Sequence, residues 1–94
     1  MNAQLPLALA MTLTRAMLDA ARVGDWERLI ALEAERHPLV VRPVPQDDDS
    51  LRQLGELLAC DRELYALISQ ARDTAAGQWQ VEHDRARAIA AYGH

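Results

Sequence analysis

The chain has few side chains that could bind a metal ion. Three histidines, His37, His83 and His94, and the single cysteine Cys60 are scattered along the sequence. Only Glu33 and His37 share a helical face, at a spacing of four residues. Zinc sites usually combine two such pairs of ligands. The sequence therefore predicts no metal site at these residues.

Three successive acids, Asp47, Asp48 and Asp49, form a second candidate for cation binding. A calcium-binding loop of the EF-hand type needs acids at alternate positions, a glycine and a more distant glutamate, and this stretch lacks that pattern. Acids are also favourable at the start of a helix, where free N–H groups and the helix dipole attract them. We expect a helix to begin here, with Asp48, Asp49 or Ser50 as its N-cap.

Nucleophilic catalysis has no better support. The two serines, Ser50 and Ser69, lie outside any nucleophile motif, and no glycine-rich phosphate-binding loop is present. A small helical protein also offers little concave volume for a substrate. The sequence predicts a binding or structural protein that is not an enzyme and carries no cofactor.

Composition predicts an all-helical domain. The 94 residues are enough for one core, and 50% hydrophobic with 26% charged residues is typical of a globular chain. The apolar residues are mainly Ala and Leu, which favour helix, and Phe is absent. The net charge is −4 and every base is Arg, without a basic cluster that would indicate nucleic-acid binding.

Three observations bear on the compartment. No run of about 18 uncharged apolar residues exists, so we expect no membrane insertion. The apolar stretch from Leu5 to Leu13 has no preceding Lys or Arg, which a secretory signal needs. The lone Cys60 fits a reducing compartment. We expect a cytoplasmic protein.

A helical hairpin is predicted around Gly24. Gly can adopt the positive φ that ends a helix, and the following Asp25 can cap the next one. We expect helices over residues 5–23 and 26–40, folded back on each other, with Trp26 buried at the corner. Pro38 predicts an end or a bend of the second helix near His37.

The remaining sequence predicts a loop over residues 42–49 and a long helix over 50–76. Gly77 is a candidate break, so the segment over residues 78–91 is either a separate fourth helix or a continuation. The expected fold is an antiparallel bundle of three to four helices with a long third helix.

Several residues within these helices have two interpretations. Asp61 falls in the apolar stripe of the long helix; it could anchor a partner or act at a switch, but we favour an N-cap after a helix interruption at Cys60. Trp79, Ile89 and Tyr92 are large apolar groups in a charged segment. Core packing is the preferred explanation for them, and the alternative is a light cover over a groove between the second and third helices.

The chain resembles the flagellar export chaperones of the FliT type, small helical proteins that escort the filament cap protein. Four short motifs, in order along nearly the whole chain, carry the resemblance: Gly24-Asp25-Trp26, Leu32-Glu33 with Arg36, Asp61-Arg62-Glu63-Leu64 and Ala91-Tyr92-Gly93. Each motif is weak alone, and their common order and spacing make the resemblance more specific.

The resemblance implies a chaperone that binds the C-terminal helical region of the filament cap protein and prevents premature assembly. It also implies contacts with the export ATPase and its soluble partners, and a last helix that covers the binding groove until a client displaces it. Carried onto this sequence, Leu32 and Arg36 line one wall of the groove, Leu64 and Ile68 line the other, and Tyr92 belongs to the cover. Because the chain ends at His94, the role in transcriptional regulation that some members have is not expected.

Two functions therefore remain after the sequence analysis. The first is a chaperone that binds a client helix through Leu32, Arg36, Leu64, Ile68, Trp79, Ile89 and Tyr92. The second is a small helical dimerisation or adaptor protein, whose apolar excess forms the interface of a homodimer. A saturable 1:1 complex with a helical peptide would distinguish the first from the second.

Overall fold

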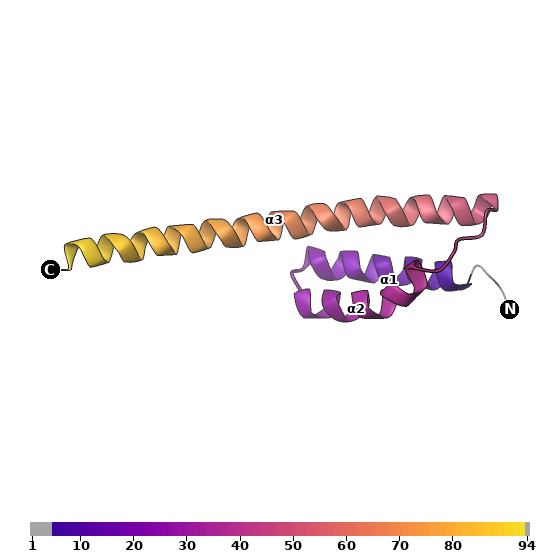
Figure 1. Cartoon of the computed structure of the whole chain (residues 1–94), viewed down its shortest axis with the longest axis horizontal. Coiled ribbons are helices and arrows are strands. Elements are labelled where there is room, and N and C mark those ends of the chain that lie inside the picture. The colour runs from indigo at the N-terminus through magenta and orange to yellow at the C-terminus, as the bar shows by residue number, and fades with distance from the viewer. Residues whose placement is uncertain (1–4, 94) are drawn as a thin grey trace.

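A short helical hairpin packs against one half of a much longer helix (Figure 1). The computed structural model describes residues 5–93, and it contains three helices: α1 (Leu5–Arg22), α2 (Trp26–Val40) and α3 (Asp48–Tyr92). No strand occurs within residues 5–93. The molecule measures 73 × 20 × 20 Å because α3 extends far beyond the hairpin. The all-helical fold expected from composition is confirmed.

The turn between α1 and α2 has the geometry expected from Gly24 and Asp25. Gly24 adopts a φ of 74°, which a residue with a Cβ resists. The N–H of Gly24 donates to the carbonyl of Ala21 (3.1 Å), and the N–H of Asp25 donates to that of Ala20 (2.9 Å). This pair of bonds is the Schellman arrangement. The Asp25 carboxylate accepts from the N–H of Arg28 (3.1 Å) and caps α2.

One helix end agrees with expectation and one differs. Helix α2 ends at Val40, as expected, and Pro38 lies inside its last turn, where the proline removes only one hydrogen bond. The N-cap of α3 is Asp47, one residue before the candidates named above. Its carboxylate accepts from the N–H of Ser50 (2.8 Å) and from the Ser50 hydroxyl (2.9 Å). Asp48 and Asp49 occupy the first turn instead.

The core lies along α1, which packs against both other helices. No Cα pair of α2 and α3 comes within 8 Å in the described chain, so α1 is the central element of the hairpin half. One cluster of buried residues lies near the hairpin turn and consists of Met17, Leu18, Ala20, Ala21, Leu29 and Leu64. A second cluster lies near the loop between α2 and α3 and consists of Leu7, Ala10, Met11 and Leu57.

Some apolar residues expected in the core are exposed. Leu9, Ile30 and Val40 all have large exposed fractions, although their spacing matches the buried stripes of α1 and α2. The expectation of a buried Trp26 is also wrong, because its side chain is 37% exposed. A helix buries only the face toward its neighbours. Because the backbone of α3 stays more than 8 Å from that of α2, the side of α2 that carries Ile30 has nothing packed over it.

The long helix α3 is continuous past Gly77. Of the two alternatives, the separate fourth helix is therefore wrong, and residues 78–91 continue the helix that begins at Asp48. The glycine costs about 1 kcal/mol relative to Ala in a helix, which is too little to break one without a cap. No Ser, Thr, Asp or Asn follows Gly77 directly, since the next residue is Gln78.

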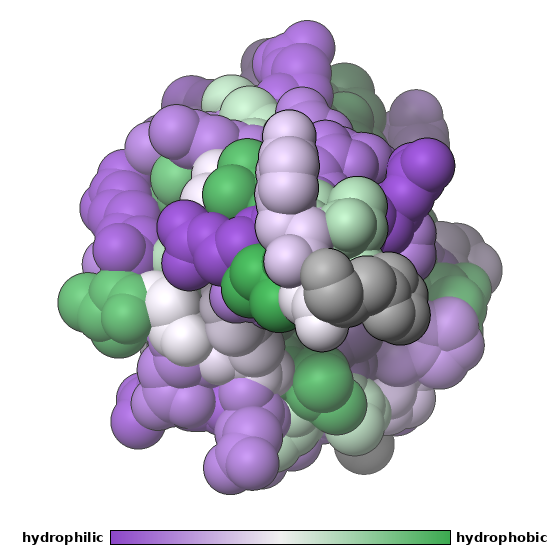
Figure 2. Space-filling view, turned by 90° about the vertical axis from the view of Figure 1, so that its left-hand side faces the viewer, coloured by the Kyte–Doolittle hydropathy of each residue, from purple (hydrophilic) through white to green (hydrophobic). Residues whose placement is uncertain are grey.

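The second half of α3 projects from the hairpin as a single helix. Residues 72–92, here called the arm, are all exposed. Trp79, Ile89 and Tyr92 are 61%, 65% and 89% exposed, so the expectation that they pack in the core is wrong. Seen along α3 from its C-terminal end, apolar and charged side chains are mixed on the surface (Figure 2). Trp79 stacks on His83 of the same helix, with ring centroids 4.8 Å apart.

Candidate helix-binding groove

An apolar groove runs between α2 and α3, with α1 as its floor. It consists of two hollows, of about 460 and 270 Å³, and Asp61 lines both of them. The groove exists because α2 and α3 each pack on α1 while their own backbones stay more than 8 Å apart. Its two walls therefore come from helices that are distant in sequence.

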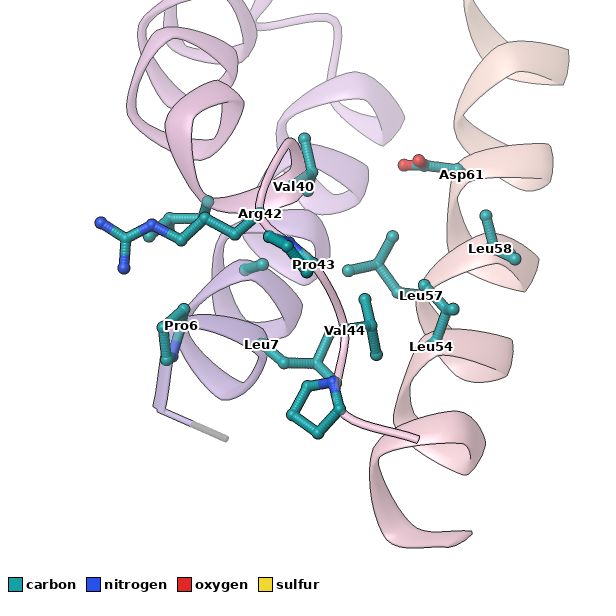
Figure 3. Close-up of a pocket in the computed structure, with 13 residues that line it drawn as sticks. Pro6, Leu7, Val40, Arg42, Pro43, Val44, Leu54, Leu57, Leu58 and Asp61 are labelled. Atoms are coloured by element: carbon teal, nitrogen blue, oxygen red, sulfur yellow. The ribbon is translucent and has the colours of Figure 1, made fainter. Parts of the chain in front are cut away.

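The larger, loop-end hollow lies beside the connection between α2 and α3. In Figure 3, Leu54 and Leu57 of α3 face Leu7 of α1 and Val44 of the connecting loop across this space. The guanidinium group of Arg42 points away from α3. The hollow is completed by further, mostly apolar residues: Pro6, Ala10, Leu39, Val40, Pro43, Pro45 and Leu58.

The smaller, hairpin-end hollow lies nearer to the turn at Gly24. Its apolar lining comes from all three helices: Met17 of α1, Leu29 and Ile30 of α2, and Leu64, Tyr65 and Ile68 of α3. Leu64 forms part of the floor and is buried, whereas Ile30 and Tyr65 stand exposed at the rims. Ile30 is thus exposed because it borders an open groove.

A buried guanidinium joins the two walls where the hollows meet. Arg36 of α2 is only 9% exposed, and its Nη1 donates to Oδ1 of Asp61 on α3 and to the hydroxyl of Thr14 on α1 (3.2 Å). Its Nη2 donates to Oε2 of Glu33 (2.8 Å). Thr14 in turn donates to the carbonyl of Ala10 (2.7 Å). All three helices therefore meet at this guanidinium.

Electrostatics keep Arg36 charged in this position. Burial lowers the pKa of Arg36, but the hydrogen bond and charge of Asp61, followed by those of Glu33, outweigh burial and raise it above the ordinary value. Charge-assisted hydrogen bonds of this kind are stronger than neutral ones. At its midpoint the groove consequently has a permanently charged ion pair that joins the two walls, with apolar space on either side.

The structure places four of the proposed client-binding residues in the hairpin half. Arg36, Leu64 and Ile68 line the hairpin-end hollow. Leu32 is half-buried and packs on the cluster around Met17, and it lines neither hollow. Arg36 is held within the protein by its two carboxylates.

The other three proposed residues lie elsewhere. Trp79, Ile89 and Tyr92 are on the arm, away from both hollows. The expectation that the C-terminal segment covers the groove is wrong for this structure, because an unbroken helix carries Tyr92 away from the hairpin. The groove is open without any displacement of the arm.

The preferred N-cap role of Asp61 is wrong, and its alternative role as an anchor for a partner stays a prediction. Helix α3 is not interrupted at Cys60, so Asp61 caps nothing; it balances the charge of Arg36 instead. Leu54, Leu58 and Tyr65 were not identified from the sequence as groove residues. A signal for them was present, because they recur with Asp61 and Ile68 at spacings of three or four along one face of α3.

Other kinds of site receive no support within residues 5–93. No group of three or more His, Cys, Asp or Glu residues is placed to hold a metal ion there, and His94 lies outside the described residues. None of the described helices combines the length and the apolar character that a membrane span requires.

Comparison with known proteins agrees with the sequence motifs. A family model described as flagellar protein FliT matches residues 7–94. No curated protein and no solved structure matches significantly. The matched range includes α2, α3 and the groove between them. The chain therefore belongs to the flagellar protein FliT family, a family of flagellar export chaperones and not of enzymes.

Proposed function

We propose that this protein binds an amphipathic helix of a flagellar client in the groove between α2 and α3. The observation that supports this function best is the groove itself, which is apolar, open, and bounded by two helices whose backbones stay more than 8 Å apart. Helix-in-groove recognition uses such a trough to bury the apolar face of an incoming helix. Burial there would shield a client surface that otherwise self-associates.

The proposed client is the C-terminal helical region of the filament cap protein. Membership of the family supports a flagellar partner, and the resemblance of the four motifs points to the cap protein. We place this binding in the cytoplasm, before export, with delivery to the export ATPase and its soluble partners as the following step. Bound client would be unable to assemble prematurely.

A charge placed in the hairpin-end hollow tests the proposal. Ile68→Glu and Tyr65→Glu each put a carboxylate into the apolar lining, and we expect either to weaken client binding at least about 30-fold, since an unpaired charge there loses its hydration. Tyr65 is exposed, so the second variant leaves the core intact. Ser69→Glu and Ala66→Glu add the same charge at exposed positions outside both hollows and serve as controls.

The measurement is fluorescence anisotropy with a labelled peptide from the cap protein, accompanied by circular dichroism to show unchanged helicity. If Tyr65→Glu and Ala66→Glu bound the peptide with equal affinity, the groove would not be the client-binding site. Loss of affinity in the controls as well would indicate a nonspecific charge effect.

The arm favours a second candidate function, that of a dimerising or adaptor protein. It exposes Trp79, Val81, Ile89 and Tyr92 on the part of α3 that extends beyond the hairpin. Pairing with another copy would cover part of this surface. Sedimentation equilibrium distinguishes the candidates: a dimer at micromolar concentration without client supports pairing, and a monomer that forms a 1:1 complex supports the chaperone.

A further inference from the structure

We infer that the groove selects a client helix with a Lys or Arg side chain at the centre of its apolar face. Two large apolar anchors should lie about seven residues apart on that helix, with the basic residue three or four positions from each. This inference rests on the proposed function and specifies which helices the groove accepts. The carboxylates of Asp61 and Glu33 are the groups that bind the basic side chain.

The spacing follows from the residues that α3 contributes. The loop-end hollow is lined by Leu57 and Leu58, three to four residues before Asp61, and the hairpin-end hollow is lined by Leu64 and Tyr65, three to four residues after it. The hollows are thus about seven residues apart, or about 10 Å at 1.5 Å per residue. A client helix aligned with α3 has the same rise, so its anchors repeat at the same interval.

The charge at the midpoint favours a donor over an acceptor. Two carboxylates, Glu33 and Asp61, surround one guanidinium, which leaves this part of the groove with one excess negative charge. Arg36 occupies one oxygen of each carboxylate. Within the described residues no hydrogen bond reaches Oδ2 of Asp61 or Oε1 of Glu33. The two side chains retain exposed fractions of 21% and 45%, so a ligand can reach them.

The arm of a second copy fits this rule less well, because its apolar pair around a basic residue, Val81 and Ile89 with Arg85 between them, is eight residues apart and not seven. Residues seven positions from the large apolar groups of the arm are small or charged: Trp79 pairs with Ala86, Val81 with Ala88, Ile89 with Glu82, and Tyr92 with Arg85. The residues midway between Trp79 and Ala86 are Glu82 and His83, and Glu82 would oppose Asp61. The spacing of its large apolar groups therefore favours a different chain as the occupant.

Three designed peptides test the inference. Each is a helix stapled on its outward face, with two Leu residues seven apart and a central Lys, norleucine or Glu. We expect the Lys peptide to bind about tenfold more tightly than the norleucine peptide, the increment of a charge-assisted hydrogen bond at a partly exposed site. The Glu peptide should bind most weakly, because it faces two carboxylates. Isothermal titration calorimetry provides the affinities.

Variants of the protein show which carboxylates produce the preference for the Lys peptide. Glu33→Gln and Asp61→Asn each remove one groove carboxylate while keeping side-chain size, and we expect either to reduce the Lys preference at least threefold. Glu63→Gln removes an equal charge from the exposed side of α3, outside both hollows, and should leave the preference unchanged. Glu33 is the more informative site, because its variant keeps the pairing of Arg36 with Asp61.

The outcomes separate the inference from the proposed function. Equal affinity for the Lys and norleucine peptides overturns the inference and leaves a purely apolar groove in place. An equal loss of preference in Glu63→Gln overturns it too, because the effect would then be long-range. No binding by any peptide overturns both the inference and the groove as a binding site.

Discussion

Replacing Asp61 by Ala removes the carboxylate that pairs with a buried guanidinium. Arg36 is 9% exposed, and the substitution leaves it Glu33 and Thr14 as partners but removes the one that joins α2 to α3. The same substitution removes the only residue that lines both hollows among those described. Stability and groove shape should therefore change together.

The expected loss of stability follows from the burial of the Arg36–Asp61 ion pair. Removing one partner of a buried ion pair costs about 3–5 kcal/mol, because a charge is left without compensation. Glu33 still pairs with Arg36 and both carboxylates reach solvent, so the lower end applies, about 3 kcal/mol. For a domain of this size, about 3 kcal/mol corresponds to a fall in melting temperature of about 12–24 °C.

Thermal unfolding followed by circular dichroism at 222 nm, the wavelength at which helix is usually monitored, measures this loss; urea unfolding gives the free energy. The matched control is Glu63→Ala. Glu63 lies two residues further along α3 and pairs with Arg22 at 2.8 Å, but both side chains are half-exposed. Water already screens that pair, so its removal should change the melting temperature little.

A double variant separates the charge from the packing. Asp61→Leu with Arg36→Met replaces the pair by apolar side chains, and the Nε of Arg36, which is buried without a hydrogen-bond partner in the described residues, is removed as well. We expect the double variant to be at least as stable as Asp61→Ala. If Asp61→Ala lowered the free energy of unfolding by less than about 1 kcal/mol, Arg36 and Asp61 would not act as a buried ion pair between the walls.

Three further predictions concern the backbone and the corner. Asp47→Ala should cost about 1 kcal/mol by removing the N-cap of α3, measured by urea unfolding, and a neutral result would contradict the capping role. Gly77→Ala should raise arm helicity and stability by about 0.4–1 kcal/mol, since nothing lies within 4 Å of an added Cβ; destabilisation would argue for a bend there. Trp26→Ala should cost about 1–2 kcal/mol, less than a buried Trp, because the ring is 37% exposed; a loss above about 3 kcal/mol would indicate a buried corner in solution.

Local features could be predicted from the sequence. The hairpin was predictable because Gly24 and Asp25 act within one turn of their own position: a positive φ ends α1, and an adjacent carboxylate caps α2. The all-helical fold was predictable because Ala and Leu favour helix throughout the chain. The N-cap of α3 was missed by one residue, since several neighbouring acids can each act as the cap.

Features that depend on distant partners could not be predicted in the same way. The role of Asp61 depends on Arg36, 25 positions away on another helix, and helical periodicity describes only one helix at a time. The exposure of Ile30 depends on the absence of a neighbour over that side of α2. The continuation through Gly77 depends on a balance of about 1 kcal/mol between a helical glycine and a break, which residue type alone does not decide.

The groove is the central claim, and backbone amide shifts on client binding test it most directly. In a titration of the labelled protein with a cap-protein peptide, followed by two-dimensional NMR, we expect the largest shifts at the residues that line the two hollows, around Asp61 on α3 and Glu33 on α2. The amides of the arm, residues 72–92, should change little. Shifts confined to the arm, with the amides around Asp61 unmoved, would contradict the account.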